Sequence, residues 1–179
     1  MGQLHKAISE KLQKFIEAQK IFFVATAAAE GRVNLSPKGM DSLRVMGVNR
    51  VVWLNLTGSG NETAAHLAES PRMTLMFCSF ESDPLILRLY GTAREVQPGD
   101  TEWESLCTEF PPSMGARQIF DMQVDLVQTS CGFAVPFFDY QGERDKLQKW
   151  IEKKGEQGIE EYWQEKNSVS LDGKPIKTP

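Results

Sequence analysis

Apolar residues near the start of the chain recur at the spacing of an amphipathic helix. Five of them would share one face of this helix: Leu4, Ile8, Leu12, Phe15 and Ile16. The pattern therefore predicts a helix over residues 3–19. Further helices are predicted over residues 60–70, over a short stretch after Asp100, and over the charged residues 142–167, with a break near Gly155 and Gly158.

Runs of β-branched and aromatic residues predict a larger number of strands. They cover residues 21–29, 50–56, 72–80, 85–96 and 117–135. Because these strands are joined by short turns and do not alternate with helices, they do not suggest a doubly wound fold. The predicted fold class is mainly β with flanking helices, arranged as a closed or nearly closed antiparallel barrel.

The stretch NLSPKGMDSLRV, residues 34–45, does not fit the strand pattern. It follows a strand and a turn, so it should be the second arm of a hairpin, yet it carries a proline, a glycine and a lysine. Proline removes a ladder donor and is tolerated at an open edge, and glycine lets a ligand approach the backbone. A lysine beside free amide donors favours an anion such as phosphate. We interpret the stretch as a strand opened to hold a ligand, with Lys38 as the anion contact; a bulge with a solvated lysine is the alternative.

A second polar segment, LNLTGSGNETAAHL, strengthens this interpretation. A predicted strand ends there and passes through Gly58 and Gly60 into a helix. Helix N-termini expose unpaired amides and attract phosphate. Helix capping alone explains the same residues, and the spacing is neither a Walker A loop nor GxGxxG. Together with Lys38, the segment indicates an anion site.

Composition narrows the classes of function. The chain has 179 residues, a mass of 20.2 kDa, a formal net charge of −4 and a pI near 5.3, which predicts one domain and argues against a nucleic-acid partner. The start lacks the apolar core of a signal peptide, and no run approaches the roughly 20 apolar residues of a membrane helix, so we expect a soluble, cytoplasmic protein with no membrane partner. The three cysteines lack CxxC spacing and there are two histidines, so neither a metal site nor a catalytic nucleophile is predicted.

The order of these segments resembles the pyridoxamine 5′-phosphate oxidase-like, FMN-binding split-barrel family. The resemblance is carried by ATAAAEGRVNLSPKG, VVWLNLTGSGNETAAHLAESPRMTLMF and ILRLYGTAREV, within residues 5–135. The closing stretch SCGFAVPFFDYQGERDKLQKWIEKKG is similar to a branch described only as related to the oxidase. The resemblance implies a six-stranded antiparallel split barrel that binds FMN over residues 1–140, with residues 141–179 as a helical extension packed on the same domain. It also implies a homodimer with FMN held between the subunits.

Carried over position by position, the resemblance implies a set of cofactor-binding residues. The segment along the flavin and the end of the following strand supply Ser36, Pro37, Lys38, Gly39, Asn55, Leu56 and Thr57. The phosphate-binding helix and a later strand supply Asn61, Glu62, Thr63 and Arg88. Contacts from the partner subunit are expected around residues 130–133. No residue is assigned a catalytic role, because the flavin itself would carry the chemistry.

The sequence departs from the oxidase at two places. Glu62 and Thr63 stand where the oxidase has Arg-Lys, which removes two positive charges from the expected phosphate position. Charge-assisted hydrogen bonds are roughly twice as strong as neutral ones, so a reduced FMN affinity is expected unless Lys38, Arg32 or Arg44 compensates. The alternative is that the ligand differs from FMN. The chain also ends in SVSLDGKPIKTP, without the Arg-Leu-x-Pro type of ending, so oxidation of vitamin B6 itself is disfavoured.

Two functions of different class follow. The first is an FMN-dependent oxidoreductase, in which flavin at a homodimer interface transfers hydride or electrons between a reduced donor and a small-molecule acceptor. The second is a non-catalytic protein that binds or senses flavin, deazaflavin or haem. The sequence names neither the substrate nor the electron donor.

Overall fold

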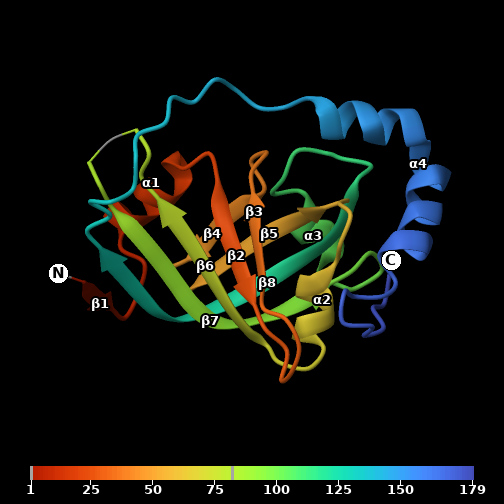
Figure 1. The fold of residues 1–179 in the computed structure, drawn as a ribbon, viewed down its shortest axis with the longest axis horizontal. Coiled ribbons are helices and arrows are strands. Elements are labelled where there is room, and N and C mark those ends of the chain that lie inside the picture. Colours follow the sequence, from red (N-terminus) through yellow and green to blue (C-terminus); the bar gives the residue numbers. More distant parts are fainter. Residues whose placement is uncertain (1, 82) are drawn as a thin grey trace.

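The computed structural model describes residues 2–81 and 83–179. In these residues one curved antiparallel sheet is surrounded by four helices (Figure 1). The strands are β1 (Gln3–His5), β2 (Phe22–Thr26), β3 (Asn34–Lys38), β4 (Leu43–Gly47), β5 (Arg50–Leu56), β6 (Arg72–Cys78), β7 (Ile86–Val96) and β8 (Ala116–Ser130). The helices are α1 (Glu10–Ala18), α2 (Glu62–Leu67), α3 (Trp103–Cys107) and α4 (Lys146–Lys166).

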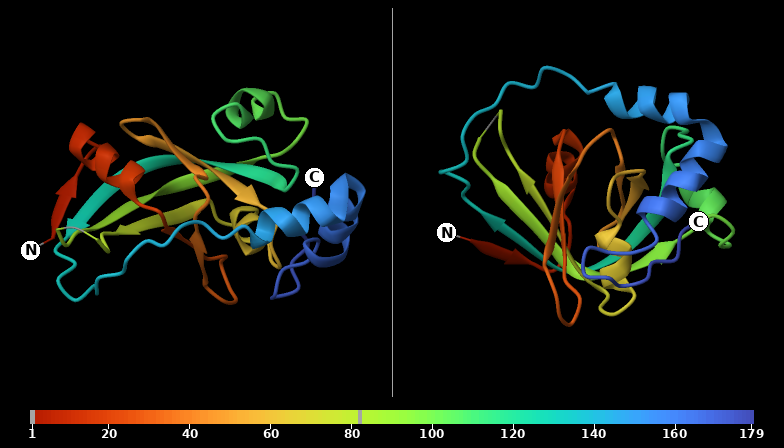
Figure 2. Two further views of the ribbon diagram at one scale, coloured as in Figure 1. Left: turned by 90° about the horizontal axis from the view of Figure 1, so that it is seen from above. Right: turned by 45° about the vertical axis from the view of Figure 1, so that its right-hand side comes forward.

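The sheet has the strand order β3-β2-β6-β7-β8-β5-β4, and β1 pairs with the far part of β8. Its two edge strands, β3 and β4, follow each other in the chain, so the turn over residues 39–42 brings the two ends of the curved sheet together (Figure 2). In the described residues these edges do not pair, which leaves a split in the barrel. The mainly β, antiparallel fold class predicted from the sequence is confirmed.

The strand count is eight, where the sequence predicted six. One reason is that residues 34–45 form two strands and not one. Met40 and Asp41 have φ angles of 60° and 52°, which turn the chain between β3 and β4.

The proline in β3 is explained by its place at the edge of the sheet. Pro37 lies opposite Phe23 of β2, and β3 is an edge strand of the sheet in the described residues, which is where a proline is tolerated. Alternate residues of β3 lie opposite buried residues of β2 and therefore face the barrel interior: Asn34, Ser36 and Lys38.

The first helix is shorter than predicted. Residues 3–5 form β1 against β8, and Leu4 is 66% exposed, so it does not join the buried apolar stripe. Ser9 begins α1 as its N-cap and accepts a hydrogen bond from the Leu12 amide. The long β8 offers an edge beyond the end of β5, and pairing with that edge overrides the helical period of the sequence.

The C-terminal part wraps around the barrel. Residues 131–145 run as an extended segment, hereafter the arm, from the end of β8 to α4, standing away from the sheet (Figures 1 and 2). Helix α4 is kinked at Gly155, whose φ is 67°. The last residues return to the barrel, where Ile176 is buried and Asp172 forms an ion pair with Arg32. No helix in the described ranges has both the length and the apolar character needed to cross a membrane.

Candidate functional site

Lys38 lies at the split, at the end of β3, and its side chain crosses to β5. Its Nζ is 3.4 Å from Asn55 Oδ1 and 5.2 Å from the ring centroid of Trp53. It forms no ion pair with a carboxylate among residues 2–81 and 83–179. Burial, and secondarily the positive charge of Arg117, lowers the pKa of Lys38 to about 8. The lysine is a partly buried cation without a counter-ion, and not the solvated lysine of the alternative interpretation.

A polar network continues from Lys38 into the barrel. Asn55 Nδ2 donates to Gln118 Oε1 at 3.3 Å. Gln118 Nε2 donates in turn to Asn61 Oδ1 at 3.0 Å and to Glu95 Oε1 at 2.7 Å. Burial raises the pKa of Glu95. The network therefore links the end of β3 with β5, β7, β8 and the residue that precedes α2.

Arg117 is a second buried cation, and sequence reasoning did not identify it. It is 1% exposed and donates to Gln118 Oε1 at 2.7 Å, to Gly60 O at 3.0 Å and to Asn167 Oδ1. Burial lowers its pKa to about 10. These bonds join β8 to the loop before α2 and to the end of α4.

A β-bulge explains why Arg117 was missed. Asn55 pairs with Gln118 but Leu56 pairs with Ala116, so Arg117 is an extra residue with no partner on β5. Strict alternation would place Arg117 and Gln118 on opposite faces, whereas the Arg117 guanidinium donates to Gln118 Oε1 at 2.7 Å. The signal available in the sequence was a charged and an amide residue at the start of the predicted strand.

The network contains more donors and positive charge than its own residues satisfy. Two cations, Lys38 and Arg117, share it with one carboxylate, Glu95. Asn61 is 2% exposed, and its Nδ2 has no hydrogen-bond partner. A buried donor without a partner and a cation without a counter-ion fit the anionic group of a ligand, such as a phosphate.

Two of the other predicted site residues, Ser36 and Thr63, lie around the same interior. Asn34 Nδ2 donates to Thr63 Oγ1 at 3.2 Å, and Ser36 Oγ donates to Asn34 Oδ1 at 2.8 Å, so β3 is tied to α2. Glu62 is turned away, because its carboxylate accepts a hydrogen bond from the Leu171 amide at 2.9 Å. Glu62, which stands where the oxidase has a basic residue, therefore binds the C-terminal residues.

The remaining predicted residues are placed elsewhere. Thr57 Oγ1 accepts a hydrogen bond from Trp163 Nε1 at 2.8 Å, so this residue packs beneath α4. Leu56 lines a cavity beside α4. Pro37 and Arg88 face the opposite side of the sheet from Lys38, and Arg88 donates to Ser130 Oγ at 3.4 Å. The structure brings Ser36, Lys38, Asn55, Asn61 and Thr63 together and leaves Pro37, Thr57 and Arg88 outside the group.

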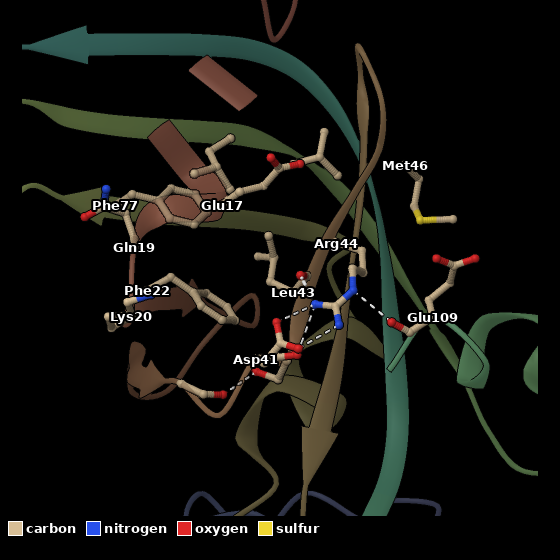
Figure 3. Close-up of a pocket in the computed structure, with 14 residues that line it drawn as sticks. Glu17, Gln19, Lys20, Phe22, Asp41, Leu43, Arg44, Met46, Phe77 and Glu109 are labelled. Atoms are coloured by element: carbon tan, nitrogen blue, oxygen red, sulfur yellow. Dashed lines mark hydrogen bonds and ion pairs between the residues drawn. The ribbon is translucent and has the colours of Figure 1, made fainter. Parts of the chain in front are cut away.

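A cavity of about 340 Å³ opens between α1 and β4, beside Gly39 (Figure 3). Apolar side chains, including Phe22 and Phe77, line it together with Arg44. The Arg44 guanidinium donates to the Asp41 carboxylate and to the Glu109 carbonyl (Figure 3).

Both arginines that were expected to compensate for the lost Arg-Lys pair form ion pairs with carboxylates of the chain. Arg44 is paired with Asp41, and Arg32 is paired with Asp172. Of the compensating cations named from the sequence, Lys38 is the one without a carboxylate partner in the described chain.

Comparison with known proteins identifies related sequences. The model of the family described as pyridoxamine 5′-phosphate oxidase matches residues 8–131. The pyridoxamine 5′-phosphate oxidase family protein ustO of Aspergillus flavus is 34% identical over 193 residues, which cover 98% of this chain and 78% of that protein.

Solved structures share the fold. A variant of HupZ from Group A Streptococcus is similar with a TM-score of 0.57 and 19% identity, over 69% of this chain and 99% of that one. The candidate pyridoxamine 5′-phosphate oxidase of Lactobacillus delbrueckii is similar with a TM-score of 0.53 and 17% identity, over 69% and 94%. At these identities the likeness supports the split-barrel fold alone.

Proposed function

Because this chain belongs to the pyridoxamine 5′-phosphate oxidase family, we propose that it binds FMN at the split of the barrel and acts as an oxidoreductase. The flavin, when bound, would supply the hydride and electron chemistry between a reduced donor and a small-molecule acceptor. The observation that carries the proposal is a Lys38 cation without a counter-ion in the described chain, joined through Asn55 and Gln118 to Asn61, whose Nδ2 has no partner.

The residues of this chain would bind and orient the cofactor. Lys38 would supply a charge-assisted hydrogen bond to an anionic group of the flavin nucleotide. Asn55 accepts a hydrogen bond from Lys38 and donates to Gln118, and Arg117 fixes Gln118 through a hydrogen bond of 2.7 Å. Because the Arg117 guanidinium already donates to three protein acceptors, it acts by positioning the network and by its positive charge.

The direct test is an absorbance spectrum of the purified protein before and after addition of FMN, followed by a fluorescence titration. Flavin absorbance bands on the protein, with quenched fluorescence and micromolar or tighter binding, would support the proposal. A protein that stays colourless and leaves FMN fluorescence unchanged would contradict it.

The same site predicts a pH dependence of FMN binding. The pKa of Lys38 in the free protein is lowered to about 8, and an anion that binds the ammonium form raises the pKa in the complex. The dissociation constant should therefore be constant well below pH 8 and rise by up to about tenfold per pH unit above it. Fluorescence titrations at several pH values would measure this, and a Lys38→Met variant should lack the rise. An alkaline rise of equal size in that variant would contradict the role of Lys38.

The alternative function is flavin, deazaflavin or haem binding without turnover. Haem needs an axial ligand, and both histidines have other partners: His66 is 2% exposed and lies 3.1 Å from Thr26 Oγ1, and His5 lies 3.1 Å from Thr129 Oγ1. These contacts count against a histidine as the axial ligand of a haem. Consumption of NAD(P)H by the FMN-loaded protein would support the enzyme, and its absence with several acceptors would favour a binding protein.

We also propose that the protein is a homodimer. The arm exposes Phe133, Phe137 and Phe138 to the extent of 82%, 79% and 62%. Exposed aromatic side chains in this number are typical of a protein interface. The arm follows directly after Ser130, so these residues continue the segment in which the family resemblance places partner contacts.

Sedimentation velocity tests the dimer. Phe133→Ser/Phe137→Ser is expected to sediment as a monomer at a concentration where the parent protein is dimeric. Val169→Ser/Leu171→Ser removes two apolar side chains that are also exposed, by 56% and 72%, but lie in the C-terminal residues, and it should remain dimeric. Equal effects of the two double variants would contradict an interface on the arm.

A further inference from the structure

Residues 57–61, hereafter the 57–61 loop, connect β5 to α2 and are held by donors from the C-terminal part of the chain. Trp163 Nε1 donates a hydrogen bond to Thr57 Oγ1 at 2.8 Å. Asn167 Nδ2 donates to the carbonyl oxygen of Gly58 at 3.0 Å. Trp163 lies in the last turn of α4 and is 7% exposed, and Asn167 follows this helix directly and is 0% exposed. Two buried donors therefore fix the first two residues of the loop.

Asn167 also acts on the far end of the 57–61 loop, through Arg117. Asn167 Oδ1 accepts a hydrogen bond from the Arg117 guanidinium, which in turn donates to Gly60 O at 3.0 Å. One amide side chain thus contacts the loop directly through its nitrogen and indirectly through its oxygen. The positions of two loop carbonyls, those of Gly58 and Gly60, depend on it.

These contacts determine the direction in which the 57–61 loop presents its amides. The described residues contain no cis peptide bond, and in a trans peptide the C=O group and the next N–H group point in opposite directions. The carbonyls of Gly58 and Gly60 face the buried donors. The N–H groups that follow them, those of Ser59 and Asn61, are therefore directed to the opposite side. Neither forms a hydrogen bond with another described residue, so both are free to donate to an anion.

The 57–61 loop has the donors that the proposed flavin site needs. Its last residue is Asn61, whose Nδ2 is buried and has no partner in the described chain. The two residues after the loop, Glu62 and Thr63, stand where the oxidase has Arg-Lys. Neutral donors bind an anion more tightly when they are fixed in advance, because they lose little conformational entropy on binding. Rigid donors would offset part of the missing charge.

We propose that the end of α4 preorganises the 57–61 loop to donate hydrogen bonds to the phosphate of FMN, with Asn167 and Trp163 as positioning residues. The inference rests on the proposed flavin function and adds to it two residues that touch the loop and not the cofactor. Both lie outside residues 8–131, the part of the chain that matches the family model. The phosphate selectivity of this chain thus depends on a segment beyond the barrel that the family shares.

Nuclear magnetic resonance relaxation of the cofactor-free protein tests the positioning directly. The amides of residues 58–60 should have order parameters of about 0.85 in the parent protein, as in rigid backbone, and below about 0.6 in Asn167→Ala. Gln164→Ala is the control, because Gln164 lies at the same end of α4 but donates to Thr178, and it should leave the loop rigid. An equally rigid loop in Asn167→Ala, or a mobile loop in the parent protein, would overturn the proposal whether or not FMN binds.

Fluorescence titrations with FMN and riboflavin, which differ by the phosphate, test the consequence for binding. The parent protein should prefer FMN. Asn167→Ala should reduce this preference about tenfold and Trp163→Phe about threefold, and neither should change the riboflavin affinity. Trp163→Phe removes the indole N–H but keeps an aromatic ring, so it tests the loop even if Asn167→Ala does not fold. Trp150→Phe, whose ring packs on Tyr162 of the same helix, should leave the preference unchanged.

The outcomes separate this proposal from the flavin function. An equal loss of affinity for both flavins in the Asn167 and Trp163 variants would show a general loss of structure and would overturn the positioning role. Equal affinity of the parent protein for FMN and riboflavin would also overturn it, but would leave flavin binding intact. Binding of neither flavin to the parent protein would overturn the flavin function and this inference together.

Discussion

Replacing Lys38 with methionine is expected to weaken FMN binding by about 1–3 kcal/mol and at the same time to stabilise the folded protein. The ammonium group has one long hydrogen bond, 3.4 Å to Asn55, and no counter-ion in the described chain. Desolvation of this charge costs free energy in the folded state that a methionine of similar length would not cost. Fluorescence titration with FMN and urea unfolding of the cofactor-free protein measure the two effects.

The sign of the stability effect depends on pH. The pKa of Lys38 is lowered from 10.5 to about 8 on folding, so the unfolded chain binds more protons between these values and stability rises with pH across that window. Below about pH 8 the ammonium is present in both states and its burial is unfavourable, on the order of 1–3 kcal/mol. The methionine variant should therefore be more stable to unfolding than the parent protein, most clearly at neutral pH. The difference in the free energy of unfolding should shrink towards pH 10.

The exposed Lys153 provides the matched control. Lys153→Met removes the same charge from the surface of α4, and it should change neither FMN affinity nor stability by more than about 0.5 kcal/mol. Unchanged FMN affinity in Lys38→Met would remove Lys38 from the site. A variant less stable than the parent protein at neutral pH would show that the lysine is well accommodated without a ligand.

The edge strand could be recognised from the sequence because its residues act locally. Pro37 and Lys38 mark an open strand edge by their own chemistry, whatever the rest of the chain does. The stripe of α1 was likewise readable, because Leu12 and Ile16 obey the helical period. The start of this helix could not be predicted from the period, because residues 3–5 pair with β8, which lies far along the chain.

The second cation of the site, Arg117, could not be predicted in the same way. Arg117 is turned inward by a bulge that exists only once β5 and β8 are paired. The orientation of Glu62 is likewise set by the Leu171 amide, which the chain brings back from its C-terminal residues. Both features arise from contacts between distant segments, and periodicity carries no information about them. Alignment to the family indicated a deficit of positive charge, and the fold supplies a cation from another strand.

Replacing Arg117 with methionine is expected to destabilise the protein by about 3–5 kcal/mol, the opposite of the effect at Lys38. Arg117 is as deeply buried as the core but has three strong acceptors: Gln118 Oε1, Gly60 O and Asn167 Oδ1. Methionine would leave the buried Asn167 Oδ1 without its donor, remove one of the two donors of Gln118 Oε1 and release Gly60 O, and a buried acceptor left unsatisfied costs about 1–3 kcal/mol. Urea unfolding followed by circular dichroism measures the loss.

The comparison of the two cations shows what a buried charge does in this fold. Arg94→Met serves as a control, because that arginine forms ion pairs with Glu102 and Asp121 but its side chain is 51% exposed, and its loss should cost less than about 1 kcal/mol. If Arg117→Met also costs less than this, the network is not held together by Arg117. If it is strongly destabilising while Lys38→Met is stabilising, then one cation is satisfied by the protein and the other is not. A cation that the protein satisfies serves the fold, and one that it does not satisfy is available to a ligand, so this pair of measurements separates structure from function without any cofactor present.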